Sequence, residues 1–177
     1  SALNFLGLMS GIATKTNKFV KIAKPYGTKI YSTRKTIVGI RELQKYALTI
    51  GGGNINRMTL DEFFFIKDNH IANTRNIVES IKQAKTFYPK KKITVEVDKI
   101  NQLNEIINEK IDVVLLDNMN ASQISKCLKL VDGRFKCEAS GKITLKNLKK
   151  IAQTKVERIS TGQLTHSIQN VDFGLEI

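Results

Sequence analysis

The sequence has no tryptophan, only two prolines and two cysteines, and 16 acidic residues. Cys127 and Cys137 match no metal-ligand spacing and are too few for a disulfide framework, so we expect reduced thiols in a cytoplasmic protein without a structural metal. No apolar run approaches the ~18 residues that a membrane-spanning helix needs. The N-terminal stretch also lacks the charged-then-apolar layout of a secretion signal. The sequence therefore predicts no membrane partner.

The chain does have the hydrophobic residues that a core requires, together with a large excess of positive charge. Of its 177 residues 41% are hydrophobic, which predicts a single domain, residues 1–177, with a buried core. The net charge of +13 indicates an anionic partner, which can be nucleic acid, an anionic membrane or a phosphorylated metabolite.

The aromatic residues bear on the first of these partners. They sit mostly inside apolar runs or on apolar faces, at Tyr46, Phe63, Phe64, Phe65, Phe87 and Tyr88. Nucleic-acid binding favours exposed aromatics interleaved with basic residues. We therefore expect no nucleic-acid partner, and a basic nucleic-acid-binding module is the alternative function from a different class.

Hydrophobic periodicity predicts a long first helix followed by alternating strands and helices. The first helix spans about residues 1–24, with a close contact at Gly7 and Gly11. The glycine run 51–53 indicates a turn and matches no nucleotide-binding motif. The predicted strands span residues 29–33, 63–66, 93–97, 113–116, 135–139 and 156–161, and the helices that follow them span residues 38–50, 73–87, 101–108, 121–130 and 145–154, with a short helix at the end.

This alternation places the chain in the α/β class. Strands joined through helices pair in parallel, and the apolar run from Val113 to Leu116 suits a strand covered on both faces. About six strands are fewer than the eight of a full barrel, which leaves an open or incomplete (β/α) barrel or a doubly wound sheet. Polar residues stand at or near the end of each strand, as at Lys67 and Asp117. An open barrel is favoured, because there these ends meet at one mouth.

Three basic residues stand at strand ends. Arg34 and Lys35 follow the first strand directly, and an Arg fork beside a Lys point charge suits carboxylate or phosphate oxygens. Lys67 follows four apolar residues, so we expect it beside the barrel axis, where its charge needs an anionic partner. The structural alternative for each is a salt bridge or a solvated surface charge.

Two carboxylates are expected at neighbouring strand ends. Glu96 lies between Val95 and Val97, so strand alternation directs its carboxylate inward. Its partner is then either Lys67 on the preceding strand or Mg²⁺ shared with Asp117. The residues alone leave a salt-bridge network and a metal site both open.

Glycine turns follow the last two strands, at Ser140-Gly141 and at Gly162. Their backbone N–H groups can receive a phosphate. His166 comes four positions after Gly162 and can face the same anion, whereas the alternative is a capping or exposed histidine. No Ser-His-Asp or Cys-His arrangement indicates nucleophilic catalysis.

A series of motifs runs along the whole chain in a fixed order. They are Ala2-Leu3-Asn4-Phe5-Leu6, Ser10-Gly11-Ile12-Ala13-Thr14, Thr33-Arg34-Lys35-Thr36, Gly51-Gly52-Gly53, Ile66-Lys67-Asp68-Asn69-His70, Val95-Glu96-Val97, Leu116-Asp117-Asn118, Glu138-Ala139-Ser140-Gly141 and Gly162-Gln163-Leu164-Thr165-His166-Ser167. In this order they resemble the quinolinate phosphoribosyltransferases, also called carboxylating nicotinate-nucleotide pyrophosphorylases.

The resemblance implies a reaction of NAD biosynthesis. Quinolinate and phosphoribosyl pyrophosphate give nicotinate mononucleotide, pyrophosphate and CO₂, with Mg²⁺ as cofactor. It implies that Glu96, Asp117 and Lys35 are catalytic and that Glu96 and Asp117 hold the metal. The residues that it implies as substrate-binding are Thr33, Arg34, Lys35, Asn56, Arg57, Lys67, Ser140, Gly141, Lys142, Gly162 and His166.

The chain departs from the family pattern at five positions. Ser32 stands where the family usually has Asp, Asn56 where it has His and Lys142 where it has Gly, and Thr161 and Gln163 replace Val and Ala around the last glycine. A paralogue of other substrate, or a phosphate-binding barrel of other chemistry, is the alternative within the fold. Lys67 favours the quinolinate enzyme over the paralogue associated with molybdenum transport, whose pattern lacks this lysine.

The resemblance also implies that the chain is the C-terminal barrel of a longer protein. The family has an N-terminal domain, in which an Arg just upstream of the Leu-Asn motif helps to bind quinolinate across a dimer interface. We expect a homodimer, or a higher homo-oligomer, and we expect the first helix with Gly7 and Gly11 to pack against surface that lies outside this chain.

Overall fold

The computed structural model describes residues 2–67 and 76–176, in which strands and helices alternate after a long first helix. That helix, α1 (Ala2–Ala23), leads through the 3-10 turn η1 (Lys24–Tyr26) into the first strand. The strands are β1 (Lys29–Tyr31), β2 (Phe64–Ile66), β3 (Ile93–Val97), β4 (Val113–Asp117), β5 (Lys136–Ser140) and β6 (Arg158–Ser160). The other helices are α2 (Arg41–Ile50), α4 (Ile77–Phe87), α5 (Ile100–Ile106), α6 (Ala121–Val131), α7 (Leu145–Ala152) and α8 (Gln163–His166).

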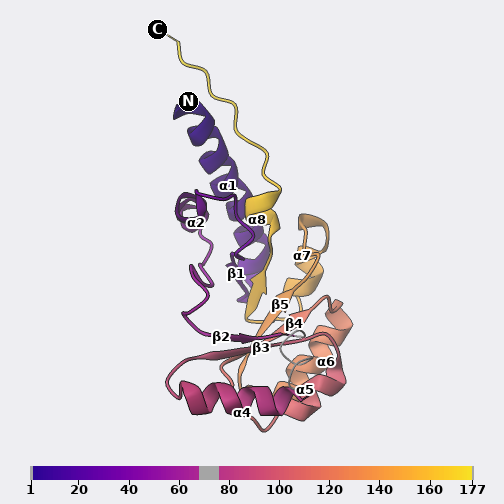
Figure 1. The fold of residues 1–177 in the computed structure, drawn as a ribbon. Coiled ribbons are helices and arrows are strands. Elements are labelled where there is room, and N and C mark those ends of the chain that lie inside the picture. Colours follow the sequence, from indigo (N-terminus) through magenta and orange to yellow (C-terminus); the bar gives the residue numbers. More distant parts are fainter. Residues whose placement is uncertain (1, 68–75, 177) are drawn as a thin grey trace.

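The six strands form one parallel sheet in the order β1-β6-β5-β4-β3-β2. Helices α4, α5 and α6 lie along its outer side (Figure 1). Within the described ranges β1 and β2 do not pair with each other, so the sheet stays open. The predicted α/β fold, an open barrel of six parallel strands with a preceding long helix, is confirmed.

The segment after α2 crosses the open side of the barrel. Asn54 forms a parallel bridge with Tyr31; its N–H donates to Ile30 O at 2.8 Å, and its carbonyl accepts from Ser32 N at 2.9 Å. This bridge extends the sheet beyond β1, yet β2 begins ten residues later at the opposite edge. Ten residues span at most ~35 Å, so the sheet has to curve until its two edges approach each other.

Strand alternation separates the core from the interior of the barrel. Val95, Val97, Leu116 and Ile159 point toward the helices and are buried in the core. Each such side chain contributes ~1.5–3 kcal/mol through burial. The residues between them, such as Glu96, point to the other face of the sheet. The core therefore lies between the sheet and the helices, and the polar side chains of the strands lie on the inner face of the sheet, toward the barrel mouth.

Helix α1 packs against α2, α7 and β1, and the C-terminal segment runs beside it (Figure 1). A Cβ on Gly7 would lie 2.6 Å from Val171 O, and one on Gly11 would collide with Gln169 O. The close contact predicted at these glycines is confirmed. The expectation that they face surface outside this chain is wrong, because their partners are the carbonyls of its own C-terminal segment.

Local geometry explains where element boundaries differ from the predicted ones. Strand β1 ends at Tyr31, and α2 starts only at Arg41, two residues after Gly39 with φ 82°. Strand β6 begins only at Arg158, after Lys155 with φ 62°. The predicted start at Asn73 of the helix before β3 lies outside the described residues.

Three aromatic side chains are more exposed than the sequence suggested. Tyr46, Phe87 and Tyr88 are 64%, 75% and 53% exposed, so the expectation that they lie on apolar faces is wrong for these three. In the described ranges no helix is both long and apolar enough to cross a membrane.

Replacing Gly11 with alanine tests the contact between α1 and the C-terminal segment. We expect a lower Tm, corresponding to ~1–3 kcal/mol, because the backbone carbonyl of Gln169 has to move. Gly174→Ala is the matched control, since no atom lies within 4 Å of a Cβ at that position. Thermal unfolding compares the two variants, and equal Tm values would contradict the contact.

Candidate active site

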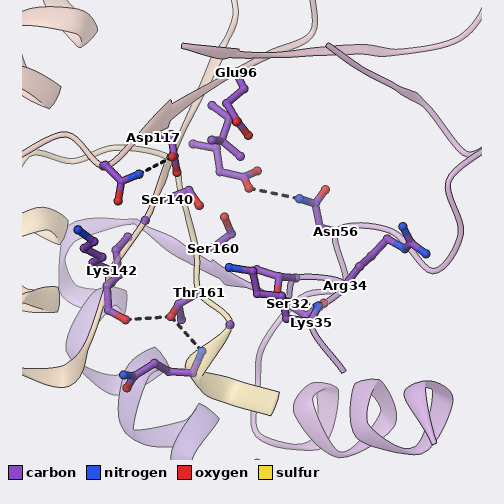
Figure 2. A pocket seen from close by; sticks show the side chains of 18 of the residues that line it. Ser32, Arg34, Lys35, Asn56, Glu96, Asp117, Ser140, Lys142, Ser160 and Thr161 are labelled. Carbon is purple, nitrogen blue, oxygen red and sulfur yellow. Dashed lines mark hydrogen bonds between the residues drawn. The ribbon is translucent and has the colours of Figure 1, made fainter. Parts of the chain in front are cut away.

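A cavity of about 720 Å³ opens at the carboxyl ends of the strands. Five basic side chains and three carboxylates line it together with His166. All thirteen residues predicted from the sequence line this one cavity: Thr33, Arg34, Lys35, Asn56, Arg57, Lys67, Glu96, Asp117, Ser140, Gly141, Lys142, Gly162 and His166. Figure 2 shows Arg34 and Lys35 on one side, with Asp117 and Ser140 across from them in this view.

The loop after β1 carries Arg34 and Lys35 into the cavity. Lys35 N donates to Thr33 Oγ1 at 3.2 Å and Thr36 N to Arg34 O at 3.0 Å, while Thr165 Oγ1 donates to Lys35 O and ties the loop to α8. Arg34 Nε is buried and has no hydrogen-bond partner. The loop therefore holds a guanidinium in place with an unused donor.

Arg57 lies against the aromatic residues at the start of β2. Its guanidinium carbon is 5.1 Å from the ring centroid of Phe63 and 4.8 Å from that of Phe65. Such contacts attract a cation to the ring face. Burial, and then the neighbouring Arg34, lower the pKa of Arg57. The aromatic rings thus stabilise the Arg57 guanidinium, which the positive charge of Arg34 repels.

Lys67 and Glu96 pair across adjacent strands. Lys67 Nζ lies 2.9 Å from Glu96 Oε2 and 4.7 Å from the ring centroid of Phe65. The salt bridge that the sequence offered as one partner for Glu96 is formed. The rest of the Lys67 motif, Asp68-Asn69-His70, lies outside the described residues.

The two carboxylates predicted as metal ligands suit an open magnesium site. Glu96 points inward from β3, and Asp117 stands at the end of the adjacent β4, where its Oδ2 accepts from Asn118 Nδ2. In the described ranges no three His, Cys, Asp or Glu side chains gather as a metal cluster. Mg²⁺ often uses one or two carboxylates and takes its other ligands from water and substrate phosphates. The pair therefore fits a metal that arrives with a phosphorylated substrate, and does not form a closed cage.

Glu138 is a cavity residue that the sequence analysis did not single out. It is almost fully buried on β5, where Asn56 Nδ2 donates to its Oε1 at 3.2 Å and Arg158 Nη1 lies 3.9 Å from its Oε2. Burial raises its pKa, against the smaller effects of Ser160 and Arg158. The signal was present, because Glu138 alternates with Cys137 and Ala139 just as Glu96 does with its valines.

The turn after β5 requires glycine at its second position. Gly141 has φ 87°, and a Cβ there would lie 2.6 Å from the backbone nitrogen of Asn118. The next residue, Lys142, also has a positive φ of 51°, and Asn147 Nδ2 donates to its carbonyl at 3.1 Å. The β4 and β5 loops therefore meet closely at the cavity wall.

The turn after β6 brings His166 and Lys35 together. A Cβ on Gly162 would lie 2.8 Å from His166 Nε2 and 3.1 Å from Lys35 Cδ. Thr161 Oγ1 donates to Ile143 O at 2.9 Å and links this turn to the one after β5. The absence of a side chain at Gly162 thus lets a histidine and a lysine approach the same wall.

Comparison with known proteins identifies the family. Residues 12–176 match the family model for the C-terminal domain of quinolinate phosphoribosyl transferase. The chain belongs to the quinolinate phosphoribosyltransferase family. The resemblance predicted from the motifs is confirmed.

Individual members of this phosphoribosyltransferase family are similar in sequence and structure over almost the whole chain. The probable carboxylating nicotinate-nucleotide pyrophosphorylase of Methanocaldococcus jannaschii is 42% identical over 100% of the chain and 66% of its own length. The carboxylating nicotinate-nucleotide pyrophosphorylase of Mycobacterium leprae is 37% identical over 99% of the chain and 63% of its own length. The crystal structure of nicotinate-nucleotide pyrophosphorylase from Ehrlichia chaffeensis has a TM-score of 0.95 and 41% identity, covering 98% of this chain and 64% of that one. The chain thus spans about two thirds of the length of these relatives.

All five departures from the phosphoribosyltransferase family pattern, Thr161 among them, line the cavity. Ser32 is fully buried on its wall, and its Oγ has no hydrogen-bond partner. Asn56 offers an amide to Glu138 where the family usually has a histidine. Lys142 and Gln163 also line the cavity. These residues leave the fold intact and change the groups that face a ligand.

The pH dependence of stability tests whether burial of the Glu138 carboxylate destabilises the folded protein when that carboxylate is charged. A carboxyl whose pKa is higher in the folded than in the unfolded state stabilises less as pH rises through that range. We expect Glu138→Gln to gain in Tm relative to the parent at pH 8 but much less at pH 5, by ~2–4 °C for each kcal/mol relieved. Glu105→Gln, an exposed change on α5, is the control. The same Tm difference at both pH values would contradict this account.

Proposed function

We propose that the protein containing this chain transfers the phosphoribosyl group of phosphoribosyl pyrophosphate to the ring nitrogen of quinolinate. The products are nicotinate mononucleotide, pyrophosphate and CO₂. The support comes from family membership and from a cavity whose residue types suit two multiply anionic substrates.

One observation carries this proposal beyond family membership. Three buried side-chain polar atoms lack a hydrogen-bond partner within the described ranges, and two of them, Ser32 Oγ and Arg34 Nε, belong to residues that line the cavity. Buried polar atoms are rarely left unpaired. An anionic ligand that accepts from Arg34 and Ser32 would satisfy both, which agrees with a carboxylate or phosphate group at this wall.

Positioning and electrostatics would carry the first chemical step. Arg34, Arg57 and Lys67 would hold the quinolinate carboxylates so that the ring nitrogen faces the anomeric carbon. Glu96 and Asp117 would face the positive charge that develops on the ribosyl ring, and Lys35 would stabilise the leaving pyrophosphate. The turns at Ser140-Gly141-Lys142 and Gly162, with His166, would take the 5-phosphate. The C–N bond forms as the C–O bond to pyrophosphate breaks.

Magnesium would add to this electrostatic stabilisation. Glu96 and Asp117 are the residues that would hold it, and it would neutralise charge on the departing pyrophosphate. Decarboxylation then follows from the product of the first step. Once the ring nitrogen is cationic, the ring can accept the electron pair left when the bond to the carboxyl carbon breaks and CO₂ leaves. A proton from water would then take the place of the carboxylate on that ring carbon.

We also propose a homodimer and a cytoplasmic location. Support for the dimer comes from large apolar side chains left exposed on two packed helices, Phe5 and Leu6 on α1 and Leu43 and Ile50 on α2. Such side chains gather at surfaces that bind another protein. The location rests on the reduced cysteines, because Cys127 and Cys137 are both free.

Removal of the Lys67 amino group tests quinolinate binding. We expect Lys67→Ala to lose ~2–5 kcal/mol of binding free energy, because a charge-assisted contact disappears without a core cavity. Calorimetric titration with quinolinate measures the affinity, and thermal unfolding checks the fold. Lys92→Ala, an exposed change just before β3, is the control. Unchanged affinity in Lys67→Ala would remove this residue from the site.

The carboxylates are tested by separating turnover from binding. We expect Glu96→Gln and Asp117→Asn to lower kcat by ~10²-fold with smaller effects on quinolinate affinity, because they act on charge that develops in the transition state. Steady-state kinetics and the titration supply the two measurements. Asp98→Asn, exposed just after β3, is the control. If both variants kept the parental kcat, the two carboxylates would have a structural role and no catalytic one.

A further inference from the structure

Lys45 on α2 is a charged residue that the proposed substrate contacts do not use. It is fully buried, although lysine is almost never fully buried unless it is paired. Neither of the two ion pairs found among the described residues involves Lys45. Its Nζ donates instead to the backbone carbonyl of Arg57. The chain therefore keeps an ammonium group in the interior with a carbonyl for its partner.

The groups around Lys45 are mostly positive. Arg41 faces it from the same helix, Arg34 from the loop after β1, and Arg57 from the segment before β2. Glu62 supplies the opposing negative charge. Burial and these arginines lower the pKa of Lys45 to about 8. The pKa of this amino group therefore lies closer to neutral than that of an exposed lysine.

Lys45 also belongs to a clamp on the backbone that presents Arg57. Arg41 Nη1 donates to Met58 O at 3.2 Å, and Glu62 Oε1 accepts from Met58 N at 2.6 Å. Thr59 N also donates to Glu62 Oε1, at 2.9 Å. With the Lys45 contact to Arg57 O, side chains hold the backbone of three successive residues, 57–59, along this turn. The Arg57 guanidinium extends from the clamp to the cavity wall. The clamp therefore joins Lys45 to the backbone of a residue whose side chain lines the cavity.

We propose that Lys45 positions Arg57 and couples the binding of a dianion in the cavity to the uptake of a proton by its own amino group. The inference rests on the proposed function, in which quinolinate is the dianion held by Arg34 and Arg57. A dianion beside these two arginines offsets positive charge that acts on Lys45, so the ammonium form becomes more stable. The proton passes from the buffer to Lys45 Nζ on binding and returns on release.

Calorimetry in buffers of different ionisation enthalpy measures this uptake directly. Quinolinate is titrated into the protein at pH 8 in at least two buffers, and the slope of heat against buffer enthalpy gives the protons exchanged. We expect uptake of up to about half a proton per ligand at pH 8. The part of the uptake that is lost in Lys45→Gln should shrink as the pH is lowered below 8, because Lys45 is then already charged without the ligand. Carboxylates ionise near pH 4, so the quinolinate carboxylates do not contribute at pH 8.

Three variants separate charge from position. Lys45→Met removes both the charge and the donor to Arg57 O, whereas Lys45→Gln keeps a donor without a titratable charge. Both should abolish proton uptake. We expect Lys45→Met to weaken quinolinate binding by about tenfold and Lys45→Gln to weaken it less. Lys82→Met, an exposed change on α4, is the matched control and should keep the parental uptake.

The outcomes distinguish this inference from the proposed function. Binding heat that does not depend on the buffer in the parent protein would overturn the coupling and leave the proposed function standing. Uptake that persists in Lys45→Gln would assign the proton to another group and overturn it as well. No quinolinate binding by the parent protein, with thermal unfolding showing that it is folded, would overturn the proposed function and the inference that rests on it.

Discussion

Repulsion among cations brought together at one end of an open barrel is the constraint on which the arrangement of the site depends. Arg34, Lys45 and Arg57 approach one another where burial weakens the screening by water. Two of the three are held by different partners, and the third keeps an unpaired donor. The Arg57 guanidinium lies on aromatic rings, Lys45 donates to a carbonyl, and Arg34 is left with a donor that has no partner.

The carboxylates face a different constraint, because strand alternation directs them into the barrel. Glu96 meets Lys67 on the adjacent strand and remains partly exposed, so its charge is stabilised by a cation and by water. Glu138 lies deeper, and its nearest cation, Arg158, is at 3.9 Å. Two glutamates that strand alternation places alike therefore differ in burial and in their partners, and burial raises the pKa of Glu138.

The sequence predicted much of the fold because local patterns report on local structure. Alternation between Val95, Glu96 and Val97 showed which side chains point inward, and the regular succession of strands and helices implied parallel pairing. The element boundaries near Gly39 and Lys155 could not be predicted from the sequence. Positive φ values interrupt helices and strands there without changing the hydrophobic periodicity. The exposure of Phe87 and Tyr88 was also missed, because a helix end can carry aromatic residues beyond the core that its middle builds.

Patterns along the chain were enough for the α/β class and for the inward direction of the strand carboxylates, because strand alternation depends on sequence neighbours. Several residues at the barrel mouth, among them Asn56 and Arg57, came instead from the resemblance of the motifs to a known family. Tertiary structure alone decided that Gly7 and Gly11 contact the chain's own C-terminal segment and that Glu138 reaches Asn56. It also decided that Lys45 is buried beneath Arg57. These contacts depend on which segments, distant in the sequence, approach one another. That approach removes water from the side chains and brings like charges together, and neither effect can be read from neighbouring residues.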